Sequence, residues 1–208
     1  MIFDFEKLAQ RLHEPLPGAA AHEAARALSA NGLRPKFDHL LPPRPGGVLI
    51  LLYPDGGHIR FPLTKRSEYK GTHSGQISLP GGKAEGTETI IETALREGEE
   101  EIGIDRNDVT VLGTLTNFFV IPSNYIVTPI VAMTSRRPVF VPQEREVVKI
   151  LEGDVEELVK VDALKTKDII VAKTYGLNAP YFDIDGEIVW GATAMMLNEF
   201  RLVLRDIL

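Results

Sequence analysis

Residues 80–104 read PGGKAEGTETIIETALREGEEEIGI, a glycine loop that leads into a segment rich in glutamate. Thr89, followed three residues later by Glu92, has the pattern of a capping box, which marks the start of a helix. Gly103 suits the end of that helix, because glycine is the usual residue just past a helix C-terminus. The sequence therefore predicts a helix over roughly residues 90 to 102.

The second half of this helix should be strongly anionic on one side. At 3.6 residues per turn, Glu97, Glu100 and Glu101 share one face, within an arc of about 100°. Like charges at this spacing repel, so a cation is expected against them. Carboxylate oxygens without cysteine or paired histidine suit Mg²⁺ or Mn²⁺, although a solvated acidic face is the alternative. The apolar residues of the neighbouring face, which should pack on the core, are Ile91, Ala94, Leu95 and Ile102.

The spacing within the segment resembles the signature of the Nudix hydrolases. It is carried by Gly82, Glu88, Arg96, Glu97, Glu100, Glu101, Gly103 and Ile104. One position departs, because Gly98 stands where the family has a bulky aliphatic residue. Gly98 falls in the apolar arc, so the change affects packing and helix propensity, at about 1 kcal/mol relative to alanine. The resemblance covers roughly residues 44 to 205 and implies an α/β/α sandwich with a mixed β-sheet.

The resemblance also implies roles for individual residues. Arg96 would orient a glutamate by ion pairing, and one glutamate would serve as base. Glu88 would either hold the loop in place or cap its backbone N–H groups. A metal ion in this site lowers the pKa of a bound water and bridges phosphate oxygens, as cleavage of a diphosphate bond requires. The implied metal ligands are Glu97, Glu100, Glu101 and the backbone carbonyl of Gly82.

The segment before the glycine loop is basic in an otherwise acidic chain. Cations opposite a metal cluster would hold a polyanion, and arginine can contact two phosphate oxygens at once, whereas the alternative is solvated residues at a strand end. The predicted substrate-binding residues are Lys65, Arg66, Ser67, Lys70, His73 and Gly81.

The same segment resembles the motif that marks the coenzyme A pyrophosphatase branch of the family. The matching residues are Leu63, Thr64, Arg66, Ser67, Gly75, Pro80, Gly81 and Gly82. Two positions depart: Gly71 replaces the second arginine of the motif and Leu79 replaces a phenylalanine. Lys70, next to Gly71, offers a point charge but cannot copy the fork of an arginine.

These features predict a Mg²⁺- or Mn²⁺-dependent diphosphatase that hydrolyses coenzyme A or acyl-coenzyme A to 3′,5′-ADP and 4′-phosphopantetheine or its acyl form. Because Gly71 replaces the arginine, a second substrate class stays open, namely other nucleoside diphosphate derivatives such as ADP-ribose, NADH or dinucleoside polyphosphates. A third possibility is a nucleotide sensor without turnover, although such a protein would be expected to lose these carboxylates.

The composition of the chain limits the kinds of partner and chemistry that are expected. The chain has 208 residues, no cysteine and a formal net charge of -6, which argues against general binding to nucleic acid or to an anionic membrane surface. Disulfides, thiolate metal sites and thiol nucleophiles are excluded. Without a signal sequence or an apolar run of roughly 20 residues, a cytoplasmic protein acting on a small molecule is predicted. Apolar N-terminal helices and the habit of the family predict a homodimer.

The chain divides into a helical extension over residues 1–43 and a Nudix domain over residues 44–208. His13, His22 and His39 are isolated and predicted to be surface or loop residues. A mixed sheet between helices is expected. The predicted helices are 3–12, 19–30, 154–159 and 190–204; residues 42–47 form a linker; the strands are 48–53, 58–64, 109–115, 125–133 and 146–151, with a terminal hairpin around residues 185–186.

Two loops carry weaker predictions. Residues 118–124 are unusually apolar, so they belong either to the core or to a wall for an adenine or pantetheine group. Glu144 and Glu146 are candidates for a base contributed from a loop.

Overall fold

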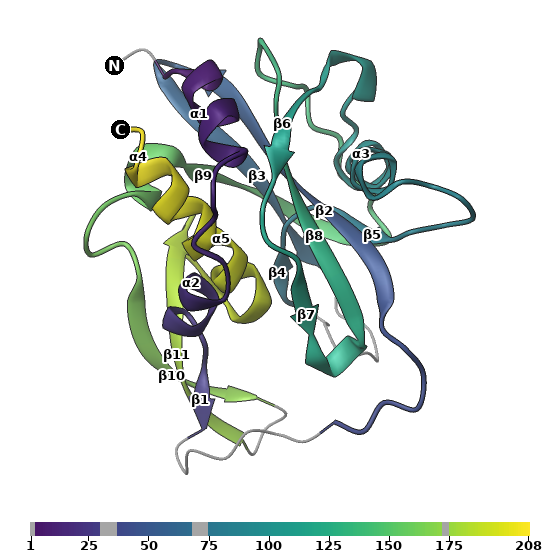
Figure 1. Cartoon of the computed structure of the whole chain (residues 1–208), viewed down its shortest axis with the longest axis vertical. Helices are drawn as coiled ribbons and strands as arrows, with labels where there is room; N and C mark the ends of the chain where they lie inside the picture. The colour runs from purple at the N-terminus through teal and green to yellow at the C-terminus, as the bar shows by residue number, and fades with distance from the viewer. Residues whose placement is uncertain (1–2, 30–36, 68–74, 172–174) are drawn as a thin grey trace.

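The computed structural model describes residues 3–29, 37–67, 75–171 and 175–208. It confirms the predicted α/β class, with a large mixed sheet and helices on both of its faces (Figure 1). The helices are α1 (Phe5–Leu12), α2 (Gly18–Ala24), α3 (Ile90–Ile102), α4 (Val155–Leu158) and α5 (Gly191–Arg205), with short 3-10 turns at Arg106–Asp108 and Ile121–Ser123. Among the described residues, no helix is long and apolar enough to cross a membrane.

The large sheet has the order β4-β3-β2-β8-β6, with β5 on β2, β7 on β8 and β9 on β3. Its centre is the parallel pair β2 and β8, in which Leu49 lies opposite Ile130, and the remaining pairs are antiparallel. The strands are β2 (Arg44–Asp55), β3 (His58–Arg66), β4 (Ile77–Ser78), β5 (Gly81–Lys83), β6 (Thr110–Thr114), β7 (Phe118–Val120), β8 (Tyr125–Met133) and β9 (Val147–Asp154).

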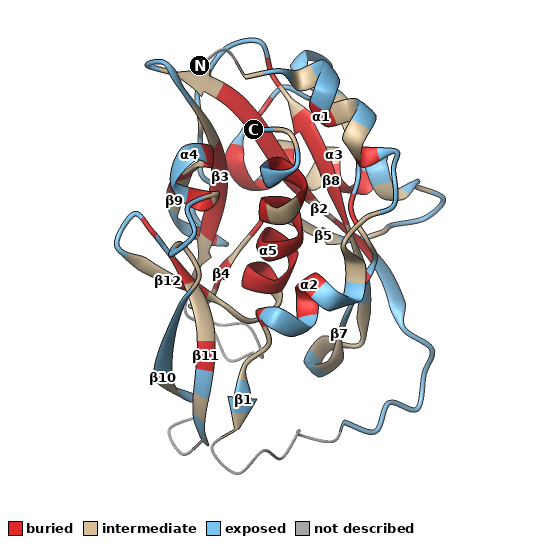
Figure 2. Ribbon diagram, turned by 60° about the vertical axis from the view of Figure 1, so that its left-hand side comes forward, coloured by how far each residue is buried: buried red, intermediate tan, exposed pale blue. Residues whose placement is uncertain are grey.

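Successive side chains of a strand point to opposite faces of the sheet. In the central part of β2 both sets of side chains are buried, each in a different core cluster. Leu49 and Leu51 belong to a core cluster with α3, whereas Ile50 and Leu52 belong to the main cluster with α1 and α5. All four are 0% exposed. Figure 2 shows α5 buried along most of its length, and it packs on α1, α2, β11 and β12. The sheet is therefore covered by α3 on one face and by α5 with the N-terminal helices on the other.

The predicted linker at residues 42–47 is wrong for its last four residues, since residues 44–47 belong to β2 and pair with β8. The glycines there allow the backbone of neighbouring elements to come close. A Cβ on Gly47 would lie 2.6 Å from the carbonyl oxygen of Ile90, and one on Gly46 would lie 2.7 Å from that of Gly82. These glycines therefore seat the start of α3 and the glycine strand β5 against the central strand.

Helix α3 has the predicted bounds, with Thr89 and Glu92 forming the capping box and Gly103 in the left-handed conformation at φ 73°. Its apolar face packs as predicted at Ala94 and Ile102, but the prediction for Ile91 is wrong, because that side chain is 39% exposed. In the first turn it is Ile90 that packs against the cluster, and Ile91 lies about 100° further around the helix. Leu95 is partly buried against the same cluster.

A second, antiparallel sheet was not predicted beyond its hairpin. It contains β1 (Leu28–Ser29), β10 (Lys165–Val171), β11 (Tyr175–Ile184) and β12 (Glu187–Trp190), in the order β1-β11-β10 with β12 also on β11. The hairpin of β11 and β12 around residues 185–186 is confirmed. The predicted helix 19–30 ends at Ala24, because Leu28 and Ser29 pair with β11 instead. Tertiary pairing overrides local helix propensity here.

The N-terminal helices share the core of the rest of the chain. Leu8 and Leu12 of α1 are buried in the main cluster. The prediction that His22 is a surface residue is wrong: it is 5% exposed, and its Nε2 lies 2.9 Å from Oε2 of Glu199 on α5. His13 and His39 are exposed, as predicted. The domain boundary at residue 43 stays a prediction.

Candidate active site

The glycine strand β5 lies against the C-terminal half of α3 (Figure 1). The backbone N–H of Gly81 donates to Oε2 of Glu101 at 3.1 Å. A Cβ on Gly82 would overlap the carboxylate of Glu97, so a larger residue there would displace that carboxylate. The structure therefore brings together both glycines and two of the three predicted metal-binding glutamates.

Arg96 binds the carboxylates on both sides of it. Its Nε donates to Glu88 at 2.8 Å, and one terminal nitrogen donates to Glu97 at 2.9 Å and to Glu100 at 3.1 Å. Glu88 also accepts from the backbone N–H of Glu85, so it both pairs with Arg96 and caps the loop. The hydrogen bond from Arg96 and then that N–H lower the pKa of Glu88 to about 2. Arg96 is thus placed to orient Glu97 and Glu100.

Glu101 is the buried carboxylate of the site, at 3% exposed. Burial raises its pKa to about 7, against the opposing effects of Arg66 and the Gly81 N–H, and the charges of Glu97 and Glu146 raise it further. Burial also raises the pKa of Glu97. The site therefore carries more negative charge than its arginines neutralise, and its oxygens, with the Gly82 carbonyl, could hold a hard divalent cation.

The predicted substrate-binding residues do not all lie at the carboxylates. Gly81 and Arg66 lie at the carboxylates, because a terminal nitrogen of Arg66 donates to Glu101 at 3.3 Å. Ser67 comes next and donates through Oγ to the carbonyl of Arg145 at 2.9 Å. Lys65 pairs instead with Glu187 of β12 at 2.7 Å. Lys70 and His73 lie outside the described residues.

A cavity of about 280 Å³ opens beside Arg66. The described residues that line it are Arg66, Ser67, Arg145 and Glu146. Sequence reasoning suggested Glu146 only as a base and missed Arg145, because no motif spacing marks the turn before β9. The structure relates Glu146 to the site, since its carboxylate lies 3.9 Å from Arg66. Glu144 is exposed.

The apolar segment at residues 118–124 lies only partly in the core, since Phe118 is its one buried residue. Phe118 is 8% exposed within the main cluster, which supports the core interpretation there, and Phe119 is 40% exposed on the other face of β7.

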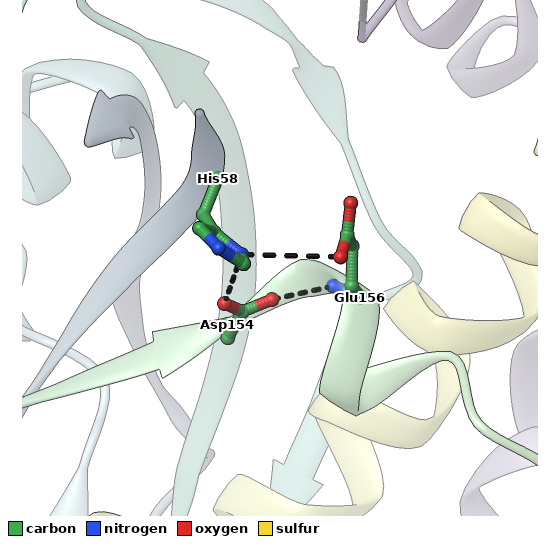
Figure 3. Close-up of side chains that lie close together, drawn as sticks. All are labelled: His58, Asp154 and Glu156. Carbon is green, nitrogen blue, oxygen red and sulfur yellow. Dashed lines mark hydrogen bonds and ion pairs between the residues drawn. The ribbon is translucent and has the colours of Figure 1, made fainter. Parts of the chain in front are cut away.

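A second group of ligand-type side chains lies at the opposite end of β3 (Figure 3). Nδ1 of His58 lies 2.9 Å from Asp154 and 3.8 Å from Glu156. His58 is eight residues along β3 from Arg66, roughly 26 Å at the rise of a strand. Asp154 caps α4 by accepting from the N–H of Glu156 at 2.8 Å, so a helix cap closed by an ion pair accounts for this arrangement.

A helix that presents glutamates to a glycine strand beside a mixed sheet defines a Nudix domain, and comparisons with known proteins agree. The family model "NUDIX domain" matches residues 43–176. The "Uncharacterized Nudix hydrolase NudL" of Pectobacterium atrosepticum is 34% identical over 146 residues, which cover 69% of this chain and 74% of that protein. The chain therefore belongs to the Nudix hydrolase family, whose enzymes generally use divalent metal ions.

Other relatives extend this picture. "Nudix hydrolase 22, chloroplastic" of Arabidopsis thaliana is 36% identical over 165 residues, which cover 74% of this chain but 53% of that protein, so the chain spans about half of its length. The crystal structure of the Nudix hydrolase RenU from M. smegmatis matches with a TM-score of 0.53 at 18% identity, covering 87% of this chain and 96% of that one. This structural likeness shows the fold alone.

Proposed function

We propose that this protein is a divalent-metal-dependent diphosphatase that hydrolyses coenzyme A or acyl-coenzyme A to 3′,5′-ADP and 4′-phosphopantetheine or its acyl form. The observation that carries the proposal is the ion pair between Arg66 and Glu101. It joins the upstream segment, residues 63–67, which resembles the coenzyme A branch, to the carboxylates of α3. An arginine at this place can hold a substrate phosphate beside the carboxylates.

We propose that Glu97, Glu100, Glu101 and the Gly82 carbonyl hold Mg²⁺ or Mn²⁺, which when bound supplies an acidified water and neutralises phosphate oxygens. Arg96 keeps Glu97 and Glu100 in place through its hydrogen bonds. The Gly81 N–H fixes the orientation of Glu101. A glutamate of this group takes the proton of the attacking water.

The test is turnover of a panel that contains coenzyme A, acetyl-coenzyme A, NADH, ADP-ribose and diadenosine polyphosphates, with Mg²⁺ or Mn²⁺ and products separated by chromatography. Selective release of 3′,5′-ADP from coenzyme A supports the proposal. Preference for ADP-ribose, NADH or a dinucleotide would overturn the substrate and leave the diphosphatase. No turnover of any compound, with metal bound, would indicate a nucleotide sensor. A Glu101→Gln preparation controls for contaminating activity.

The homodimer and the cytoplasmic location are also proposals. Light scattering on the purified protein, with and without metal, measures the assembly: a mass near twice 23.0 kDa supports a dimer, and a mass near that value excludes it. Imaging or fractionation of cells that produce the full-length protein tests the location.

A further inference from the structure

The cavity beside Arg66 has a positive lining in an acidic protein. The described residues that line the cavity include two arginines, Arg66 and Arg145, but only one carboxylate, that of Glu146. The carboxylate of Glu146 is 53% exposed and already lies near Arg66, so it is only partly available to repel an anion. The whole chain, by contrast, has a formal net charge of -6.

Both arginines have guanidinium N–H donors that make no hydrogen bond within the described part of the chain. Arg66 directs one terminal nitrogen to Glu101 at 3.3 Å and the other toward Glu146 at 3.9 Å, while its buried Nε has no hydrogen-bond partner among the described residues. Within the described part of the chain, the guanidinium of Arg145 makes no hydrogen bond or ion pair. A guanidinium that lines a cavity without a counter-charge is suited to a ligand carboxylate or phosphate.

The turn that carries Arg145 is held firmly against the site. The N–H of Gln143 donates to the carbonyl of Glu101 at 3.0 Å, which joins the turn to the end of α3. The N–H of Arg145 donates to the side chain of Gln143 at 2.6 Å, and Ser67 donates to the carbonyls of Arg145 and Glu146. These bonds fix the backbone of Arg145 beside the site before any ligand binds, while its side chain is exposed and can reach the cavity.

We propose that Arg145 is a specificity-determining residue that, with Arg66, binds a phosphate monoester of the substrate separate from the diphosphate that is cut. Arg66 lies between Glu101 and the cavity, so a phosphate held there is one guanidinium away from the carboxylates of α3. This inference rests on the proposed function, because coenzyme A carries such a group, its 3′-phosphate, and ADP-ribose and NADH do not. Arg145 would then supply a second arginine fork for the substrate.

The first arm of the test compares kcat/KM for coenzyme A and for dephospho-coenzyme A, which lacks the 3′-phosphate. Arg145→Ala should lower the value for coenzyme A by about 10- to 100-fold, as expected for a lost charged hydrogen bond, and leave dephospho-coenzyme A nearly unchanged. Arg145→Lys should restore only part, because an ammonium cannot make the forked contact. Arg136→Ala is the matched control, since Arg136 is 79% exposed and pairs with Asp108 far from the cavity.

The second arm needs no turnover. Calorimetry in EDTA compares binding of adenosine 3′,5′-bisphosphate with that of 5′-AMP, and Arg145→Ala should abolish the preference for the bisphosphate. If this preference exists and is lost while coenzyme A is not cleaved, the inference holds and the proposed function fails. If coenzyme A is cleaved but Arg145→Ala weakens both ligands equally or neither, the inference is overturned and the function stands.

Discussion

Two buried glutamates in this molecule have opposite surroundings. Glu199 on α5 is 0% exposed and accepts hydrogen bonds from Thr116 Oγ1 at 2.6 Å, His22 Nε2 at 2.9 Å and the Gly18 N–H at 3.0 Å. Burial acts to raise its pKa, but the hydrogen bonds from His22 and Thr116 outweigh it and lower the pKa. A carboxylate satisfied in this way joins the N-terminal helices to the rest of the protein.

Glu101 is almost as buried, at 3% exposed, yet it has fewer donors and lies beside the negative charges of Glu97 and Glu146. Its pKa is raised to about 7. A buried charge without enough partners costs free energy, and proteins keep such groups mainly where a ligand completes them. Burial alone therefore does not identify a functional carboxylate. What distinguishes Glu101 from Glu199 is that, among the described residues, it has fewer hydrogen-bond donors to satisfy its charge.

The largest expected effect comes from removing the charges at the site. Glu100→Gln or Glu101→Gln should lower turnover of the best substrate by orders of magnitude, because each removes a proposed metal ligand, while the melting temperature without metal stays equal or rises as repulsion is relieved. Glu99→Gln, on the same helix but paired with Arg106, is the control and should keep turnover. Wild-type turnover in either site variant would show that the metal ligands are misassigned.

Glu199→Gln should have the opposite effects, lowering stability and leaving turnover unchanged. Removing the buried charge leaves the donors of Thr116, His22 and Gly18 partly unpaired, so the free energy of unfolding in urea should fall by about 3 to 5 kcal/mol. Turnover per folded molecule should not change, since the hydrogen-bond partners of Glu199 include none of the proposed site residues that the structure describes. Glu157→Gln, 66% exposed at its pair with Lys160, should cost less than about 1 kcal/mol. A stable but inactive Glu199→Gln would contradict the separation of the two carboxylates.

The two glutamates should also respond to pH with opposite signs. Glu101 has a raised pKa, so its contribution to stability is fully present below pH 4.5 and is lost as pH rises through about 7. Without metal, wild type should therefore lose about 3 kcal/mol relative to Glu101→Gln over this interval. Glu199 has a lowered pKa, so its contribution is present above pH 4.5 and is lost in acid. Urea unfolding of both variants from pH 3 to 8 checks this; slopes of the same sign would contradict it.

Local signals made much of the fold predictable. The capping box at Thr89 and the glycine at position 103 fixed both ends of α3, because each acts within a few residues. Strand β10 could not be found in this way: Ile170 is 76% exposed, and the strand exists through its pairing with β11. The extension of β2 through residues 44–47 likewise depends on β5 and β8, which follow later in the chain.

The residues of the candidate site also divide into those that a local sequence pattern predicted and those that it did not. Glu97 and Glu101 were predictable because helical periodicity places them on one face. Arg145 was not, since its place in the cavity next to Arg66 depends on residues far away in the sequence. Outside the site, the burial of His22 was missed for the same reason, because its partner Glu199 is equally distant. No spacing rule encodes such contacts between distant segments.

The smallest expected effect comes from a substitution in α3 that tests whether this helix and α5 behave independently. A Cβ on Gly98 would lie 2.9 Å from Leu49 Cδ2 and 3.0 Å from Ile104 Cδ1, so Gly98→Ala gains about 1 kcal/mol of helix propensity but crowds two buried side-chain ends at a similar cost. The net change in unfolding free energy should stay below about 1 kcal/mol. Because Gly98 and Glu101 share a helix that would shift, Gly98→Ala should combine non-additively with Glu101→Gln, but additively, within about 0.5 kcal/mol, with Glu199→Gln. Additivity in both pairs would mean that α3 does not move when a methyl group is added at Gly98, and that the carboxylate site is insensitive to packing at this position.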